Sequence, residues 1–184
     1  MAASLISPAT ALQLTGIEGV DGTWVLDRFA HPKVGVTRVG LMLSRAKYGE
    51  FGPPAHQLGM RLGEVMSDRT WPTDLVVVPV PSSSDLVGEL ARLTGAVLGR
   101  RSERVLGVRL GLLGRLDGSV RGRVKVRRWR GRRVPRFVLL VDDTVCTGDT
   151  LTACAQQLRA RGAERVWAVA TCAVADEHVI STVT

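Results

Sequence analysis

The segment from Val138 to Thr150 holds the residues whose types and spacing are best suited to chemistry. Four aliphatic residues are followed by two adjacent acids, Asp142 and Asp143, and then by a short loop rich in hydroxyl groups. This pattern places the acids at the carboxyl end of a buried strand, where ligands bind in open parallel sheets. The helix expected after the loop would point unpaired N–H groups and its positive dipole end at an anion such as phosphate.

Two carboxylates next to a bound phosphate would repel it unless they face hydrogen-bond donors or a cation. Sugar hydroxyls supply donors, and a magnesium ion supplies positive charge. Thr147 and Thr150 add hydroxyl groups to the loop. The residues therefore predict a site for a phosphorylated ribose. In the alternative interpretation, the acids only cap a turn between a strand and a helix.

The apolar residues around this segment predict alternating strands and helices. Short apolar runs without polar alternation indicate strands buried in a parallel sheet over Leu75–Pro79, Phe137–Val141 and Arg165–Thr171. Apolar residues at helical spacing indicate helices over about 53–68, 86–98 and 151–162. Residues 12–30 predict a hairpin that turns at Asp21-Gly22. We therefore expect an α/β fold, with a parallel sheet covered by helices on both faces.

Composition is that of one compact domain over residues 1–184. Of these residues 45% are hydrophobic and 23% are charged, which is enough to bury roughly 70% of the unfolded surface and excludes a disordered tail. The longest apolar run, from Val166 to Ala175, is about half of the roughly 20 residues that cross a bilayer. The first residues lack the basic start of a secretory signal. We expect a cytoplasmic protein that does not enter a membrane.

Cysteine usage excludes two further classes of protein. The three cysteines, Cys146, Cys154 and Cys172, are an odd number without C-x-x-C spacing. They support neither a disulfide framework nor a structural zinc site, so free thiols are expected.

The basic residues are concentrated in one segment. Nine of the 25 Arg and Lys residues lie between Arg121 and Arg136 with no acid among them, so this segment supplies the net charge of +8. Valines alternate with basic residues from Val120 to Trp129, which predicts a hairpin that turns at Arg130-Gly131. Such a segment is either a solvated arm or a surface that binds phosphate groups.

The segment from Val138 to Thr150 resembles the phosphoribosyl pyrophosphate (PRPP) signature of type I phosphoribosyltransferases, in which aliphatic residues precede two acids and a Thr-Gly-x-Thr loop. The resemblance implies a Rossmann-like fold and magnesium-dependent transfer of ribose 5-phosphate from PRPP to a nitrogenous base or amine, with release of pyrophosphate. Asp142 and Asp143 would be the catalytic residues, hold the ribose hydroxyls and contact magnesium directly or indirectly. The 5′-phosphate of PRPP or of a nucleoside monophosphate would be held by Thr144, Val145, Cys146, Thr147, Gly148, Asp149 and Thr150.

Two further motifs resemble the ComF-like branch of this superfamily, which is related to amidophosphoribosyltransferases. They are Ala46-Lys47-Tyr48-Gly49 before a helix and Val78-Pro79-Val80-Pro81 at the end of a strand. The resemblance covers about residues 20–175 without the cysteine-rich zinc module that such proteins often carry, so no zinc is expected. It also implies an N-terminal hood over about residues 1–35 and a flexible basic hairpin over about residues 117–136 that closes over the site.

The chain departs from this branch after the second motif. Ser82, Ser83, Ser84 and Asp85 replace an Arg-Gly-Phe-Asn-Gln type of segment. These residues either contact pyrophosphate through hydroxyl and backbone N–H groups, with Asp85 helping to hold magnesium, or only cap the following helix. Cys146 stands where some purine-salvage relatives carry an acid near the base, so no general base is assigned. No acceptor is assigned either, because the hood that holds the base is variable in the superfamily.

Two functions from different classes agree with these residues. The first is a magnesium-dependent phosphoribosyltransferase. Dimers are usual in the superfamily, so the basic hairpin is either a loop that closes over the site or an arm of a homodimer interface. The second is a non-catalytic regulator that binds PRPP or a nucleotide, or a DNA-uptake accessory protein of the kind associated with ComF-like relatives. In the second, the residues from Arg121 to Arg136 would contact nucleic acid, and binding would weaken with salt at a logarithmic slope of about −8 if all nine cations touched phosphates.

Overall fold

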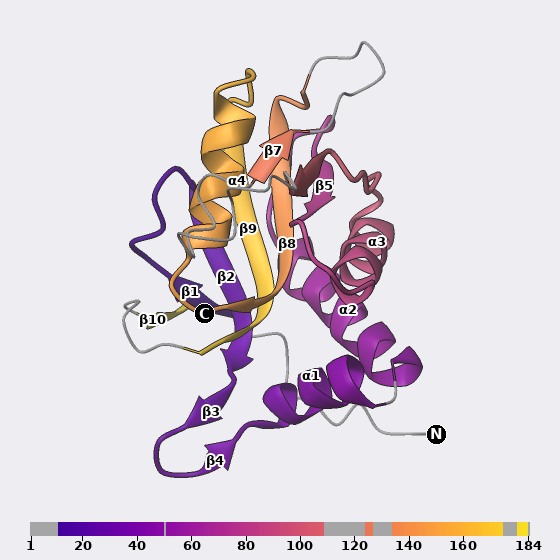
Figure 1. The fold of residues 1–184 in the computed structure, drawn as a ribbon, viewed down its shortest axis with the longest axis vertical. Helices are drawn as coiled ribbons and strands as arrows, with labels where there is room; N and C mark the ends of the chain where they lie inside the picture. The colour runs from indigo at the N-terminus through magenta and orange to yellow at the C-terminus, as the bar shows by residue number, and fades with distance from the viewer. Residues whose placement is uncertain (1–10, 50, 109–123, 127–133, 175–179, 184) are drawn as a thin grey trace, which may run out of the picture.

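A six-stranded mixed sheet forms the centre of the molecule (Figure 1). The computed structural model describes residues 11–49, 51–108, 124–126, 134–174 and 180–183. The strands of the sheet are β1 (Ala11–Leu14), β2 (Gly22–Arg28), β5 (Val76–Pro79), β8 (Phe137–Val145), β9 (Arg165–Ala173) and β10 (Ile180–Val183). Two short pairs lie outside it, β3 (Ala30–His31) with β4 (Gly35–Val36) and β6 (Leu106–Val108) with β7 (Val124–Val126). The helices are α1 (Arg38–Tyr48), α2 (Gly52–Ser67), α3 (Leu86–Leu98) and α4 (Asp149–Arg159).

The sheet has the strand order β10-β1-β2-β9-β8-β5. Strands β2, β9, β8 and β5 are parallel, whereas β1 and β10 pair antiparallel at one edge. Leu151 and Leu158 of α4 are buried in the core of one face. Leu43 of α1, Leu58 of α2 and Leu90 of α3 are buried in the core of the other face. This confirms the predicted α/β fold, with helices on both faces of a mostly parallel sheet.

Strand β8 is longer than the apolar pattern predicted, because it continues through the two acids to Val145. Its parallel pairing with β9 continues over the same stretch, with Asp142 opposite Ala170 and Thr144 opposite Cys172. The acids therefore lie inside a paired strand, near its carboxyl end, and not in the loop that follows it.

The first hairpin forms, but the prediction of a turn at Asp21-Gly22 is wrong. β1 and β2 pair antiparallel, with Leu12 opposite Val25, and Gly22 already begins β2. The connection between them contains Gly16 and Gly19, whose φ angles are 84° and 76°. Since only glycine adopts such angles readily, these two residues reverse the chain over a longer connection.

Only part of the basic segment lies in the described residues. The predicted turn at Arg130-Gly131 lies outside them. β7, which is described, pairs antiparallel with β6, with Val126 opposite Leu106. The roles expected for this segment, closure over a site and contact with nucleic acid, stay predictions.

Helix α1 lies across the carboxyl end of the parallel strands, next to the β3–β4 pair (Figure 1). Its N-cap is Thr37, whose hydroxyl accepts a hydrogen bond from the Gly40 N–H at 3.0 Å and donates one to the Arg28 carbonyl at 2.6 Å. Its buried residues are Val39, Gly40, Leu43 and Ala46. These contacts attach the helix to the end of β2.

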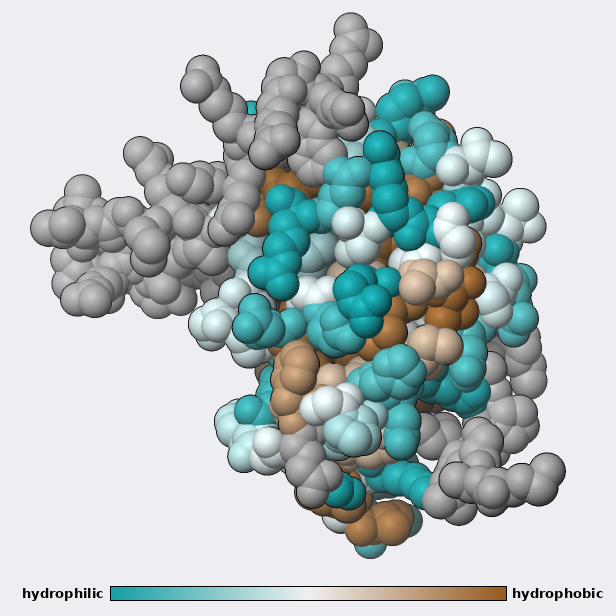
Figure 2. All heavy atoms as spheres, turned by 90° about the vertical axis from the view of Figure 1, so that its right-hand side faces the viewer, coloured by the Kyte–Doolittle hydropathy of each residue, from teal (hydrophilic) through white to brown (hydrophobic). Residues whose placement is uncertain are grey.

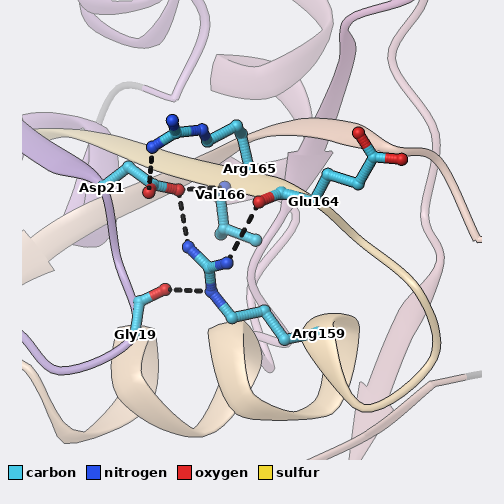
Figure 3. A network of polar contacts seen from close by, with 6 residues as sticks. All are labelled: Gly19, Asp21, Arg159, Glu164, Arg165 and Val166. Atoms are coloured by element: carbon cyan, nitrogen blue, oxygen red, sulfur yellow. Dashed lines mark hydrogen bonds and ion pairs between the residues drawn. The ribbon is translucent and has the colours of Figure 1, made fainter.

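The opposite end of the sheet is held together by Asp21, which lies just before β2 (Figure 3). Its carboxylate accepts hydrogen bonds from Arg159 Nη2 at 2.6 Å, Arg165 Nη1 at 3.0 Å and the Val166 N–H at 2.8 Å. Arg159 also donates to the carbonyl of Gly19 at 2.7 Å. The network joins the β1–β2 connection, the last turn of α4 and the start of β9.

The face formed by α2 and α3 has hydrophilic side chains over much of its area, with hydrophobic ones between them (Figure 2). Both helices bury their apolar sides against the sheet. None of the helices in the described part of the chain is long and apolar enough to cross a membrane.

Candidate binding site at the carboxyl end of β8

Asp142 follows residues 138–141 of β8, which have no exposed surface. Asp142 is itself only 8% exposed, and its Oδ1 accepts a hydrogen bond from the Asp143 N–H at 2.7 Å. Burial and, to a smaller extent, the charge of Asp143 raise the pKa of Asp142 to about 7. Burial therefore favours the protonated form of the Asp142 carboxyl group, which can both donate and accept hydrogen bonds.

Asp143 forms an ion pair with Lys47, which lies in the last turn of α1. Lys47 Nζ is 2.9 Å from Asp143 Oδ1 and donates a hydrogen bond to Thr144 Oγ1 at 3.2 Å. The side chains of Lys47 and Asp143 are 26% and 13% exposed, so the pair is partly shielded from water. The Thr171 hydroxyl of β9 donates to the Asp143 carbonyl oxygen. Residues of α1 and β9 thus hold this position of β8.

The two acids have different partners. Successive side chains of a strand point to opposite faces of the sheet. Asp143 reaches Lys47 on α1, whereas the charge of Asp142 acts on α4, where burial and then this charge raise the pKa of Cys154. A ligand at this edge would meet one carboxylate that already has a cation and one acid whose pKa is raised by burial.

The connection from β8 to α4 brings hydroxyl and N–H groups to the start of the helix. Gly148 is the N-cap with φ of 78°, and its carbonyl accepts from the Thr152 N–H at 2.9 Å. Thr147 Oγ1 donates to Asp149 Oδ2 at 3.0 Å. Cys146 and Thr147 are exposed. The structure thus brings the predicted acids and the predicted loop together at one end of the sheet.

The predicted pyrophosphate residues, 82–85, follow β5, which is the strand next to β8. Parallel neighbours end at the same edge, so these residues and the acids share that edge of the sheet. Ser82, Ser83 and Ser84 are exposed, and Ser82 Oγ accepts from the Ser84 N–H at 3.1 Å. Asp85 is the N-cap residue of α3 but makes no side-chain hydrogen bond there. Its carboxylate therefore does not cap the helix.

A cavity of about 450 Å³ lies beside this segment and is lined by Ser82, Ser83, Ser84, Gly88 and Arg104, among others. The Arg104 guanidinium lies against Gly88 in the first turn of α3. The approach is so close that a Cβ at position 88 would collide with the guanidinium. Arg104 Nη2 is 3.9 Å from Asp85 Oδ1. The lining thus combines serine hydroxyl groups and a guanidinium, which suit an anion, with apolar residues such as Val80, Val87 and Leu106.

Two basic residues of this edge, Lys47 and Arg104, were missed in the sequence analysis. Lys47 stands in the Ala46–Gly49 motif, so a signal was present, but no spacing connected it to Asp143. Arg104 carries no signal that distinguishes it from the many other arginines of the chain.

The acid pair is a poor set of direct ligands for a metal ion. Across the ranges that the structure describes, no three His, Cys, Asp or Glu side chains gather as a metal site. Asp142 Oδ1 accepts a backbone hydrogen bond, and Asp143 Oδ1 faces the ammonium group of Lys47. Magnesium prefers a near-octahedral set of oxygen ligands, so these two carboxylates suit sugar hydroxyls better than a resident magnesium ion.

No protein-family model matches the chain, and no curated protein matches it. It is similar in fold to a hypoxanthine phosphoribosyltransferase from Staphylococcus aureus, at 18% identity and a TM-score of 0.44, over 63% of this chain and 61% of that one. The allosteric regulatory enzyme of purine biosynthesis is 23% identical, with a TM-score of 0.45, over 62% of this chain and 25% of that one. A hypothetical protein from Neisseria gonorrhoeae with bound ppGpp is 16% identical, with a TM-score of 0.45, over 65% and 66%. The chain thus spans less than two thirds of each of these proteins.

Proposed function

We propose that the protein is a phosphoribosyltransferase that transfers ribose 5-phosphate from PRPP to a nitrogenous base or amine. The observation that carries the proposal is the acid pair Asp142 and Asp143 on a buried strand, directly before a glycine-containing connection to the start of α4. The two acids, which suit ribose hydroxyls, then lie next to the N–H groups at the start of α4, which suit a phosphate. The motifs at residues 46–49 and 78–81, at the ends of α1 and β5, support a ComF-like branch.

The sugar phosphate would lie between the end of β8 and the start of α4. Ribose hydroxyls would donate hydrogen bonds to Asp142 and Asp143, and the 5′-phosphate would accept them from backbone N–H groups of the first turn of α4. The Thr147 hydroxyl would exchange its present partner, Asp149, for a phosphate oxygen. The helix dipole adds about 0.3–1 kcal/mol per charge at such a position.

The pyrophosphate group would extend toward residues 82–85 and Arg104. The exposed hydroxyls of this segment donate hydrogen bonds, and the Arg104 guanidinium offers paired donors to phosphate oxygens. In this proposal magnesium enters bound to the diphosphate of PRPP, as part of the substrate.

The transfer depends on electrostatic stabilisation of the ribose and needs no nucleophile from the protein. The lone pair of the acceptor nitrogen forms a bond to the anomeric carbon, and the carbon–oxygen bond to pyrophosphate breaks with its electron pair on the pyrophosphate. The acceptor then loses a proton to solvent. Positive charge develops on the ribose next to the β8 acids, and loss of one such preorganised interaction costs about 3 kcal/mol, which is on the order of a hundredfold in rate.

Calorimetry with PRPP and magnesium tests binding, and pyrophosphate release with a panel of purines, pyrimidines and ammonia tests transfer. The double variant Asp142→Asn with Asp143→Asn should abolish binding, and Asp74→Asn, on an exposed residue, should not. Failure of the wild-type protein to bind PRPP would contradict the proposal. PRPP binding without release for any acceptor would favour a non-catalytic regulator instead.

A further inference from the structure

We propose that Lys47 is a positioning residue of the sugar-phosphate site and supplies its cation, so that the site binds ribose 5-phosphate without a divalent metal ion. This inference rests on the proposed function, because it concerns the same site.

The geometry of Lys47 is that of a bridge between two adjacent residues of β8. Its Nζ lies 2.9 Å from Asp143 Oδ1 and 3.2 Å from Thr144 Oγ1. One of these atoms belongs to the acid expected to face ribose hydroxyls, and the other to the first residue of the expected phosphate loop. Lys47 therefore orients both parts of the site at once through charge-assisted contacts.

Charge explains why this cation matters for a phosphate ester. A phosphate dianion placed next to two ionised carboxylates would be repelled by both. Lys47 compensates the charge of Asp143, the acid directly before the first residue of the expected phosphate loop. The site can thus accept a dianion without the magnesium ion that the acid pair alone would require.

The fold holds Lys47 in this place before any ligand binds. Thr37 caps α1, and Gly40 lies against the end of β2. Leu43 and Ala46 of the same helix are 1% and 4% exposed in the core that also contains Cys172 of β9. A side chain carried by a helix anchored at several points is preorganised, so little ordering is needed when the sugar phosphate arrives.

The test is calorimetric titration of the full chain with ribose 5-phosphate, once in excess EDTA and once in excess magnesium chloride. The wild-type protein should bind equally in both. Lys47→Met should weaken binding in EDTA by about tenfold to a hundredfold, the usual effect of a lost hydrogen bond to a charged group, and magnesium should restore part of it. Lys47→Arg should retain metal-independent binding.

Lys33→Met is the matched control, because it removes the same charge from an exposed residue outside the site. Equal weakening in the Lys33 and Lys47 variants would assign the effect to net charge and overturn the inference. Wild-type binding only in magnesium would overturn it while leaving the proposed function intact. Absence of binding to ribose 5-phosphate and to PRPP with magnesium would contradict the proposed function itself. If Lys47→Met does not fold, the inference is tested by the wild-type titrations in EDTA and in magnesium and by the metal-independent binding of Lys47→Arg.

Discussion

Gly40, in the first turn of α1, lies directly against the backbone carbonyl of Phe29. A Cβ at position 40 would collide with the Phe29 carbonyl oxygen. Because residue 40 has no side chain, α1 can approach the end of β2 closely enough for Thr37 to join the two elements by hydrogen bonds. The same approach determines where Lys47 meets Asp143, at the other end of the helix.

Gly40→Ala is therefore expected to lower the free energy of unfolding by about 1–3 kcal/mol, since a backbone carbonyl cannot move aside without displacing the helix. It should also weaken binding of ribose 5-phosphate, because α1 would carry Lys47 away from β8. Urea unfolding and calorimetry measure the two effects. Gly52→Ala at the start of α2 is the control, because a Cβ there meets nothing within 4 Å. Equal stability of the two variants would contradict the close approach.

Asp142 should make the protein less stable as pH rises. Its pKa is about 7 in the fold and about 3.9 in an unfolded chain. Between these values the folded state binds the extra proton, so the free energy of unfolding falls as pH increases from about 4 to about 7 and then levels off. The contribution is at most about 4 kcal/mol.

Urea unfolding of the wild-type protein and of Asp142→Asn across this pH range isolates the effect. The variant should lose the decline, and its stability relative to wild type should increase with pH. Asp74→Asn, on an exposed residue, should keep the wild-type profile. If the free energies of unfolding of wild type and Asp142→Asn change with pH in parallel, burial does not raise the pKa of Asp142.

Gly148 is expected to be required for the shape of the loop before α4. Its φ of 78° costs any other residue about 1–2 kcal/mol, so Gly148→Ala should destabilise the fold and turn the N–H groups of the first helical turn away from a phosphate. Gly162→Ala is a matched control. Gly162 also has a positive φ, of 101°, but lies beyond the other end of α4. Both variants should lose stability in urea, but only Gly148→Ala should lose ribose 5-phosphate binding. A loss of binding in both would contradict a local role for Gly148.

The α/β class and the position of the two acids near the carboxyl end of a buried strand could be predicted because they depend on short stretches of chain. Fully buried strands need uninterrupted apolar residues, and Val138–Val141 supplies them directly before the acids. The length of β8 could not be predicted in the same way. It continues through Asp142 and Asp143 because β9 pairs with it there. The sequence of β8 alone does not show where a partner strand pairs with it.

The ion pair of Lys47 with Asp143 lay beyond sequence reasoning for a related reason. Its geometry depends on where α1 rests, and that position depends on contacts of Gly40 and Thr37 with the end of β2. The Ala46–Gly49 motif drew attention to the residue by resemblance alone. Side-chain type and spacing therefore identified a candidate loop, whereas the position of the Lys47 cation follows from tertiary packing.

Asp21 should stabilise the end of the sheet that lies away from the site. Its side chain is 17% exposed, and its carboxylate accepts hydrogen bonds from Arg159, Arg165 and the Val166 N–H. Asp21→Ala leaves these donors without their acceptor and should lower the free energy of unfolding by about 2 kcal/mol. Binding of ribose 5-phosphate should be unchanged, because the network joins the start of β9 to the end of α4 (Figure 3).

Glu164→Ala provides the comparison, because Glu164 pairs with Arg136 at 2.6 Å but both side chains are more than half exposed, at 51% and 60%. Exposed pairs contribute little to stability, so this variant should unfold in urea close to the wild-type midpoint. An equal decrease in the free energy of unfolding in the two variants would show that the Asp21 network stabilises the fold no more than a surface ion pair does. A loss of ligand binding in Asp21→Ala would show that the two ends of the sheet are coupled, contrary to the local role argued for this network.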